Sequence, residues 1–297
     1  MVTEQSAGGG TFRVTLLGTG VPTPSTVRFG PSTLVEAGNE KFLFDAGRGA
    51  IQRLAQLKPP VREVRHVFLT HLHSDHIVGL PDVWLTGWLH GRPKLPFRIW
   101  GPLGTVKMME HLDRAFDFDI RIRLYDDQPP PEGVVVLAQD VAGGTVYEHN
   151  GVRITAFEVD HFPIQPSYGY RIDYAGRSVV ITGDTRMHTP IVTAAKGADV
   201  LIHEVICADM LRASAPDHPD AMERVIAHHS TPEQAGEIFA QVQPRLAVFT
   251  HIIPINAGEK DILPSVRKTY AGPVEVGEDL MVIDIGDEIS VKRPGLH

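Results

Sequence analysis

Residues 71–76 of this 297-residue chain read His71-Leu72-His73-Ser74-Asp75-His76, which places four potential metal ligands within six positions. The residues before them, Val64–Thr70, predict a strand, and the apolar segment Ile77–Leu89 predicts the start of a helix after them. On such a strand-to-helix loop, His71 and His73 can point the same way while Asp75 and His76 reach a neighbouring position. Imidazole and carboxylate groups suit zinc and other borderline first-row cations. The stretch therefore allows two adjacent metal sites; the alternative is a surface histidine cluster.

Three further candidate ligands each follow a predicted strand. They are His161 after residues 154–160, Asp184 after residues 179–183, and His251 after residues 247–250. The carboxyl ends of the strands in an open α/β sheet converge on one crevice, so separate strands can deliver ligands to one point. Their shared placement favours one metal centre over three independent turn-stabilising residues.

The composition is that of an ordinary soluble globular protein, with 42% hydrophobic and 22% charged residues. A formal net charge of −8 argues against a dedicated nucleic-acid binder, because neutralising phosphates needs a basic surface. Cys207 is the only cysteine, so histidine and carboxylate must supply any metal ligands. No apolar run approaches the ~18 residues that span a bilayer, and no signal-peptide pattern opens the chain. We therefore expect a cytoplasmic protein without a membrane partner.

Predicted strands and helices alternate along the chain, which indicates a layered α/β architecture. We expect one domain over residues 1–297, with residues 1–10 disordered. A helix is predicted near Val106–Phe116, and the proline-rich segment Asp126–Gly133 is expected to form a surface loop. Thr231–Gln234 spells a capping box with Pro232 at the first helical position, which predicts the start of another helix.

Several motifs together resemble the metallo-β-lactamase superfamily and, within it, the ribonuclease Z branch. The motifs, in chain order, are Phe42-Leu-Phe-Asp45-Ala-Gly47, the 71–76 stretch, His161 with Pro166 and Gly169-Tyr170-Arg171, Gly183-Asp184-Thr185, and Thr250-His251. The segments at 229–236 and 249–254 look particularly like the arylsulfatase-type and phosphodiesterase-type members. The likeness runs from about Val14 to His251. It implies a four-layer αββα sandwich with the metal site at one edge.

The resemblance also implies how the ligands are shared. His71, His73 and His161 would hold one metal, Asp75, His76 and His251 the other, and Asp184 would bridge the two. The family pattern places Asp45 beside the ligands, where a carboxylate orients a ligand imidazole; the alternative is a plain turn aspartate. Two Zn²⁺ ions are the default expectation, with Mn²⁺ or Fe²⁺ also accepted by such ligands.

Two ions ~3.5 to 4 Å apart can hold a hydroxide between them and clamp both the attacking and the leaving oxygen. We expect this bridging hydroxide to attack the substrate, with Asp75 accepting its proton. His229 is expected to donate a hydrogen bond or proton to the substrate, the alternative being an exposed histidine of the capping loop. Strand alternation lets only one of His203 and Glu204 face the site, and we favour Glu204, supporting His229. The remaining histidines, His228 among them, are expected to be surface or packing residues.

The preferred function is hydrolysis of a small ester, an aryl sulfate or a phosphodiester, by a protein that is a homodimer and binds no nucleic acid. A ribonuclease Z-like tRNA 3′-processing endonuclease is the runner-up. Only residues 172–183 separate Arg171 from Asp184, which leaves no room for the long Gly/Pro-rich arm with which that family grips tRNA. A lactonase and a non-catalytic metal-binding protein also fit the sequence, because one fold hosts many activities.

Overall fold

The computed structural model describes residues 10–57, 61–91 and 94–295. The predicted disordered start, residues 1–10, lies outside the described residues except for Gly10. The strands are β1 Phe12–Gly18, β2 Ser32–Ala37, β3 Glu40–Phe44, β4 His66–Phe68, β5 Phe97–Gly101, β6 Val136–Asp140, β7 Gly144–His149, β8 Val152–Glu158, β9 Tyr168–Tyr174, β10 Arg177–Ile181, β11 Val200–Ile206, β12 Leu246–Ile253, β13 Val274–Val276, β14 Val282–Ile285 and β15 Ile289–Lys292. The helices are α1 Ala50–Gln56, α2 Ser74–Ile77, α3 Leu80–Leu89, α4 Thr105–Tyr125, α5 Thr189–Ala194, α6 Ala208–Ser214, α7 Pro219–Ile226, α8 Pro232–Val242 and α9 Glu259–Val266.

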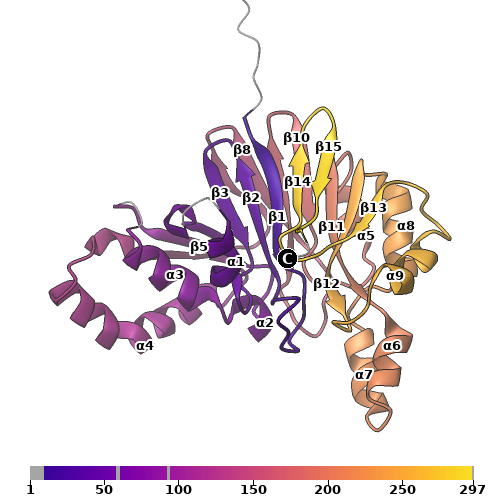
Figure 1. Ribbon diagram of the computed structural model, residues 1–297, viewed down its shortest axis with the longest axis horizontal. Coiled ribbons are helices and arrows are strands. Elements are labelled where there is room, and N and C mark those ends of the chain that lie inside the picture. Colours follow the sequence, from indigo (N-terminus) through magenta and orange to yellow (C-terminus); the bar gives the residue numbers. More distant parts are fainter. Residues whose placement is uncertain (1–9, 58–60, 92–93, 296–297) are drawn as a thin grey trace, which may run out of the picture.

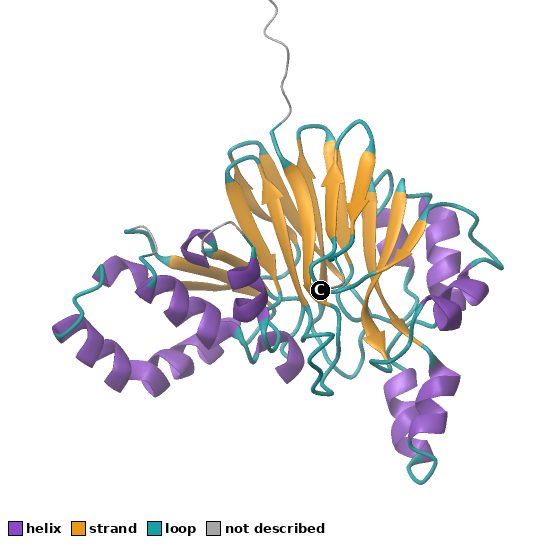
Figure 2. Ribbon diagram, viewed as in Figure 1, coloured by secondary structure: helices purple, strands orange, loops and turns teal. Residues whose placement is uncertain are grey.

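Within these residues the strands form two sheets that lie face to face (Figures 1 and 2). The eight-stranded sheet has the order β15-β14-β1-β2-β3-β4-β5-β6, and the seven-stranded sheet has the order β13-β12-β11-β10-β9-β8-β7. Strands β3 to β6 run parallel to one another, as do β10 to β13. Helices α1, α3 and α4 cover the outside of the first sheet, and α5, α8 and α9 cover the second (Figure 1). The predicted four-layer αββα sandwich is confirmed.

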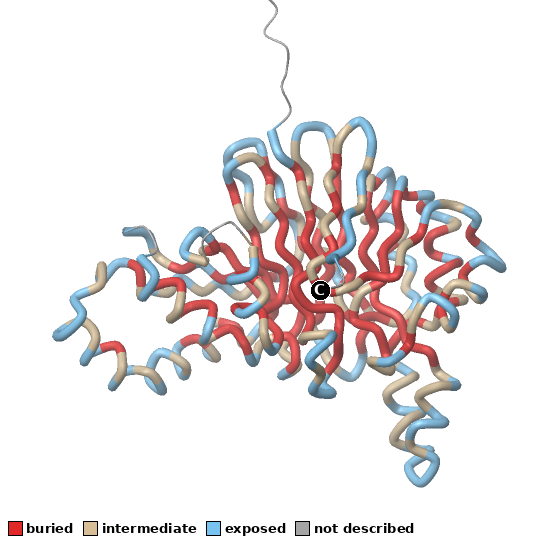
Figure 3. The backbone as a smooth tube through the Cα atoms, viewed as in Figure 1, coloured by how far each residue is buried: buried red, intermediate tan, exposed pale blue. Residues whose placement is uncertain are grey.

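Three apolar cores separate these layers, and Figure 3 shows the buried backbone concentrated there. The central core joins the two sheets through side chains such as Phe44, Phe68 and Tyr170. Alternate residues of the same strands face outward: Leu43 and Val67 pack under the first helical layer, and Val180 and Leu201 under the second. Burial on both faces explains the apolar runs in parallel strands such as β4 and β12.

The helices differ in part from the sequence prediction. The apolar run after the ligand stretch forms two helices, α2 and α3, and Pro81 lies in the first turn of α3, where a missing N–H costs nothing. Helix α4 is 21 residues long and extends well beyond the predicted end at Phe116. The predicted capping box at Thr231 is present at the start of α8. No helix among the described residues is long and apolar enough to cross a membrane.

Candidate metal centre

The predicted ligands meet at the edge of the sandwich where the parallel strands end. His71 and His73 lie on the loop after β4, and Asp75 and His76 lie in α2. His161 follows β8 and Asp184 follows β10, while His251 lies inside β12. At His251 the pairing register shifts, since Glu204 pairs with Thr250 but Val205 pairs with Ile252. His251 is thus the extra residue of a bulge with φ 43°, a device that redirects a strand side chain.

Asp184 stands at the middle of this cluster. Its Oδ2 lies 3.4 Å from Nε2 of both His76 and His251, 3.8 Å from Nε2 of His71 and 3.9 Å from Nε2 of His161. The carboxylate and the four imidazoles are buried. One carboxylate oxygen therefore faces four ring nitrogens in a space that water barely reaches.

Two groups of ligand atoms can be separated around this carboxylate. The ligand atoms of His71, His73, His161 and Asp184 all lie within 4.8 Å of one another.

A second group with the same spacing consists of Asp75, His76 and His251. Asp75 Oδ2 lies 3.4 Å from His251 Nε2 and 3.7 Å from His76 Nε2. The structure thus brings together all seven predicted ligands, in the two groups that the resemblance implied.

Asp45 controls the orientation of two of these rings. Its carboxylate accepts hydrogen bonds from the Thr70 N–H (2.8 Å), the Thr70 hydroxyl (2.9 Å) and His76 Nδ1 (2.8 Å). Because the Thr70 hydroxyl donates to Asp45, it accepts from His71 Nδ1 at 3.0 Å. Both rings are therefore protonated at Nδ1 and direct Nε2 toward the cluster. The main chain of His228 does the same for His161, whose Nδ1 donates to its carbonyl oxygen at 2.9 Å.

The unpaired atoms of the cluster fit a bound cation. Nε2 of His71, Nε2 of His76 and Oδ1 of Asp184 are buried and have no hydrogen-bond partner among the described residues. Uncompensated buried polar groups are costly, and a metal ion would supply the missing partner. The donor set of imidazoles and carboxylates is the one that zinc-type ions accept.

The electrostatics also favour added positive charge. Burial lowers the pKa of His71 well below its usual value and that of His161 to about 4, so both are neutral ligands. Burial also opposes charge on His76 and His251, but the Asp184 carboxylate outweighs it and raises the pKa of both rings. The cluster thus combines neutral imidazoles at His71 and His161 with carboxylates that favour positive charge.

His229 and Glu204 form a buried pair beside the ligands. Glu204 Oε1 lies 3.1 Å from His229 Nδ1 and accepts the backbone N–H groups of Thr185 (3.1 Å) and Ser230 (3.0 Å). Burial raises the pKa of Glu204 well above its usual value and lowers that of His229 to about 4. His203, the neighbour on β11, turns to the other side and contacts Phe239. The structure places the expected pair in contact.

His228 is the residue at this site that sequence reasoning missed. Its half-buried ring lies 4.8 Å from the rings of both His161 and His229. Its adjacency to His229 is the one sequence signal that could have identified it. Here the turn after α7 brings both rings to the cluster.

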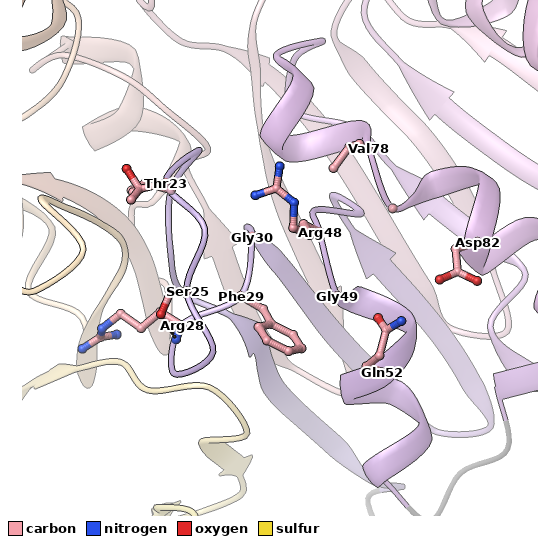
Figure 4. A pocket seen from close by; sticks show the side chains of 12 residues that line it. Thr23, Ser25, Arg28, Phe29, Gly30, Arg48, Gly49, Gln52, Val78 and Asp82 are labelled. Atoms are coloured by element: carbon pink, nitrogen blue, oxygen red, sulfur yellow. Dashed lines mark hydrogen bonds between the residues drawn. The ribbon is translucent and has the colours of Figure 1, made fainter.

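The cavities near the centre differ in size and in chemistry. The space that His76, Asp184, Glu204 and His251 help to line measures about 20 Å³, room for one water-sized group. A hollow of about 330 Å³ opens beside the ligand loop, at Gly30 and Gly79 (Figure 4). Its polar lining comes from Thr23, Ser25, Arg28, Arg48, Gln52 and Asp82. None of the seven ligands lines this larger hollow, so its size does not make it the place of the chemistry.

Comparison with known proteins identifies relatives of this arrangement. Residues 40–252 match the family described as "Beta-lactamase superfamily domain". A ribonuclease Z of Mycolicibacterium gilvum is 38% identical over 290 residues, which cover 96% of this chain and 100% of that protein. The human short-form tRNase Z superposes with a TM-score of 0.67 at 27% identity, over 92% of this chain and 99% of that one. The Bacillus subtilis protein YhfI gives a TM-score of 0.69 at 19% identity, over 92% of this chain and 99% of that one, which shows the shared fold.

These relatives correct two predictions. The preferred aryl sulfate or other small ester substrate is wrong, and so is the expectation of no nucleic-acid partner, because the similar proteins are ribonucleases Z. The short interval between Arg171 and Asp184 was a poor criterion, since a ribonuclease Z matches this chain over its whole length. The net charge was also a poor guide to nucleic-acid binding, because the total charge of a chain does not describe the charge of any one part of its surface. The arylsulfatase-type likeness finds no support in these proteins.

The fold, the ligand cluster and the relatives agree. The chain belongs to the metallo-β-lactamase superfamily, in its ribonuclease Z branch, and is a metal-dependent hydrolase that acts on ester bonds.

Proposed function

We propose that this protein is an endoribonuclease that removes 3′ trailers from tRNA precursors. The observation that carries the proposal is a ligand set around Asp184 in a chain of which 96% matches a ribonuclease Z. Ligands come from both sheets, so we also propose that residues 1–297 act as a single catalytic domain.

The two ligand groups would hold two divalent ions, with zinc as the default. His71, His73 and His161 would bind one ion, Asp75, His76 and His251 the other, and Asp184 would contact both. Such a pair of ions polarises a phosphodiester and lowers the pKa of an attacking water. Asp45, through its bonds to His76 and Thr70, would keep the ligand rings in the tautomer that binds metal.

The His229–Glu204 pair would manage the proton of the reaction. Both groups are driven toward their neutral forms by burial, so the resting pair carries little charge. Negative charge that develops on a departing ribose oxygen would raise the pKa of His229, because an opposite charge favours the protonated ring. The imidazole could then hold a proton and pass it to that oxygen, while Glu204 fixes the ring from the other side.

Asp75 would take up the proton of the attacking water. Its pKa is lowered, against the effect of burial, by the hydrogen bond with His251 and the charges of His76 and His251. The proton would therefore stay only briefly on this carboxylate before it passes to solvent or to the leaving oxygen.

The test is cleavage of a tRNA precursor with a 3′ trailer by the zinc-loaded protein, with mapping of the cut position. We expect one cut at the trailer junction, and cleavage about 10² to 10⁴ times slower by the His229→Ala variant at matched metal content. A mature tRNA and an unrelated single-stranded RNA serve as substrate controls. Failure to cleave the precursor with two metals bound would overturn the proposal, as would equal cleavage of all three RNAs.

A further inference from the structure

Helix α4 carries a stripe of basic and aromatic side chains on its outer face. The residues of this α4 stripe recur at intervals of three and four, which places them along one side of a helix. They are Lys107, His111, Arg114, Phe118, Ile122 and Tyr125. The opposite side of α4, which includes Met109, Phe116 and Ile120, packs on the first sheet.

The α4 stripe exposes three large apolar side chains to solvent. Phe118 is 73% exposed, Ile122 51% and Tyr125 83%. Lys107 and Arg114 are exposed too, and neither forms an ion pair with any residue in the described parts of the chain. Apolar patches of this kind on a protein surface mark interaction sites.

The stripe leads away from the metal centre. Gly104, the residue before α4, lies against Leu72, which stands between the ligands His71 and His73. From that point the 21 residues of α4 run for about 30 Å at 1.5 Å per residue. The helix forms the margin of the molecule on the side of the first sheet (Figure 1). The helix that carries the stripe therefore begins beside the ligand loop and extends away from it.

We propose that the α4 stripe is a docking surface for the body of the RNA substrate. Free cations suit backbone phosphates, and exposed aromatic rings stack on unpaired bases. A tRNA precursor offers both along its length. No carboxylate lies within the stripe; Glu110 and Asp117 flank it, and Asp117 pairs with Arg121 at 2.9 Å. A second copy of the chain fits less well, because packing the stripe on itself brings Lys107 and Arg114 toward the same cations, whereas RNA offers a phosphate to each of them.

This inference rests on the proposed function, and its test separates the two. Single-turnover cleavage of a tRNA precursor gives a half-saturating enzyme concentration and a maximal rate for each variant. The cation variant is Lys107→Ala with Arg114→Ala, and the aromatic variant is Phe118→Ala with Tyr125→Ala. The matched control is Lys268→Ala with Lys292→Ala, two exposed lysines on α9's flank and on β15. Hydrolysis of bis-p-nitrophenyl phosphate reports the metal centre alone.

We expect the cation variant to raise the half-saturating concentration about tenfold or more and to reduce the slope of log affinity against log salt by roughly 1.5, at about 0.7 to 0.9 per phosphate contact. The aromatic variant should weaken binding by about tenfold or more without a change of slope. Maximal rates and phosphodiester hydrolysis should stay at wild-type values in all three variants.

If the wild-type enzyme cleaves the precursor but the cation and aromatic variants keep its affinity and its salt dependence, the proposed role of the α4 stripe is wrong. The proposed function would then stand. Sedimentation that shows a dimer becoming a monomer, with RNA affinity per protomer unaltered, would assign the stripe to an interface between copies and likewise overturn the proposal. A wild-type protein that neither binds nor cleaves the precursor would remove the proposed function and this surface together.

Discussion

Replacing His229 with alanine should slow precursor cleavage by about 10² to 10⁴, the usual contribution of a positioned acid or base. At 1.36 kcal/mol for each factor of ten, this equals roughly 3 to 5 kcal/mol of the activation barrier. His229 is not among the seven proposed ligands, so the variant should keep its full metal content. Its ring nevertheless lies close to Asp184 and His251, and the three could together hold an ion. Elemental analysis therefore has to accompany the rate.

Glu204 provides the second half of this prediction. In Glu204→Gln the retained Oε1 can still accept the N–H groups of Thr185 and Ser230, so the local fold is kept. The contact with His229 Nδ1 at 3.1 Å is made by the same Oε1 and is kept, so the substitution removes only the negative charge that a carboxylate can offer to a protonated His229. We expect about a tenfold lower rate, which corresponds to roughly 1.4 kcal/mol, because the charge that stabilises the protonated ring is lost.

The effects of His229→Ala and Glu204→Gln on the cleavage rate should not be additive. If Glu204 acts through His229, Glu204→Gln in the His229→Ala background should cost less than about threefold. The assay is single-turnover cleavage at saturating enzyme for the wild type, both single variants and the double variant. A tenfold loss in both backgrounds would show that Glu204 acts independently. Loss of metal from His229→Ala would make the histidine a ligand and refute the reasoning.

Asp184→Ala should lose at least one metal ion and nearly all hydrolysis; elemental analysis that finds both ions retained would contradict its shared position. Asp45→Ala should weaken metal binding by about 10- to 100-fold in chelator competition, because His76 loses its orienting partner. Since Asp184 raises the pKa of His76 and His251, these rings hold protons that metal must displace. Zinc uptake by the apoprotein should therefore release protons and weaken as the pH falls; titration in weak buffer without proton release would disprove this. Asp279→Ala removes a buried carboxylate that binds four donor groups across the chain and should cost about 3 to 5 kcal/mol in urea unfolding, with metal content unchanged.

Much of the metal centre could be predicted because its ligands follow strands in a simple pattern. His71 follows the buried strand β4, which ends at Phe68, and Asp184 follows β10, which ends at Ile181, in the same way. Parallel strands that end at one edge then bring these side chains together by topology alone. His251 lies inside a strand and reaches the site through a bulge, a backbone feature that residue patterns do not reveal.

Helix α4 and His228 show where sequence reasoning stopped short. The apolar period of α4 weakens after Phe116, because its distal half has only Ile120 and Leu124 against the sheet and exposes Phe118 and Tyr125. A periodicity argument reads that mixture as the end of the helix. His228 depends on the turn after α7, a tertiary feature. The substrate was misjudged because ligand chemistry is shared across the fold and does not identify the leaving group.

The spread of the ligands along the chain has a consequence for biosynthesis. The first ligand is residue 71 and the last is residue 251. At about 5 to 20 residues per second, a ribosome adds the intervening segment in roughly 10 to 40 s. Throughout that interval the nascent chain carries His71, His73 and His76 without the strand that completes their site. The metal centre can close only after His251 has been added, so the loading of the correct ion follows the synthesis of the first ligands by at least that interval.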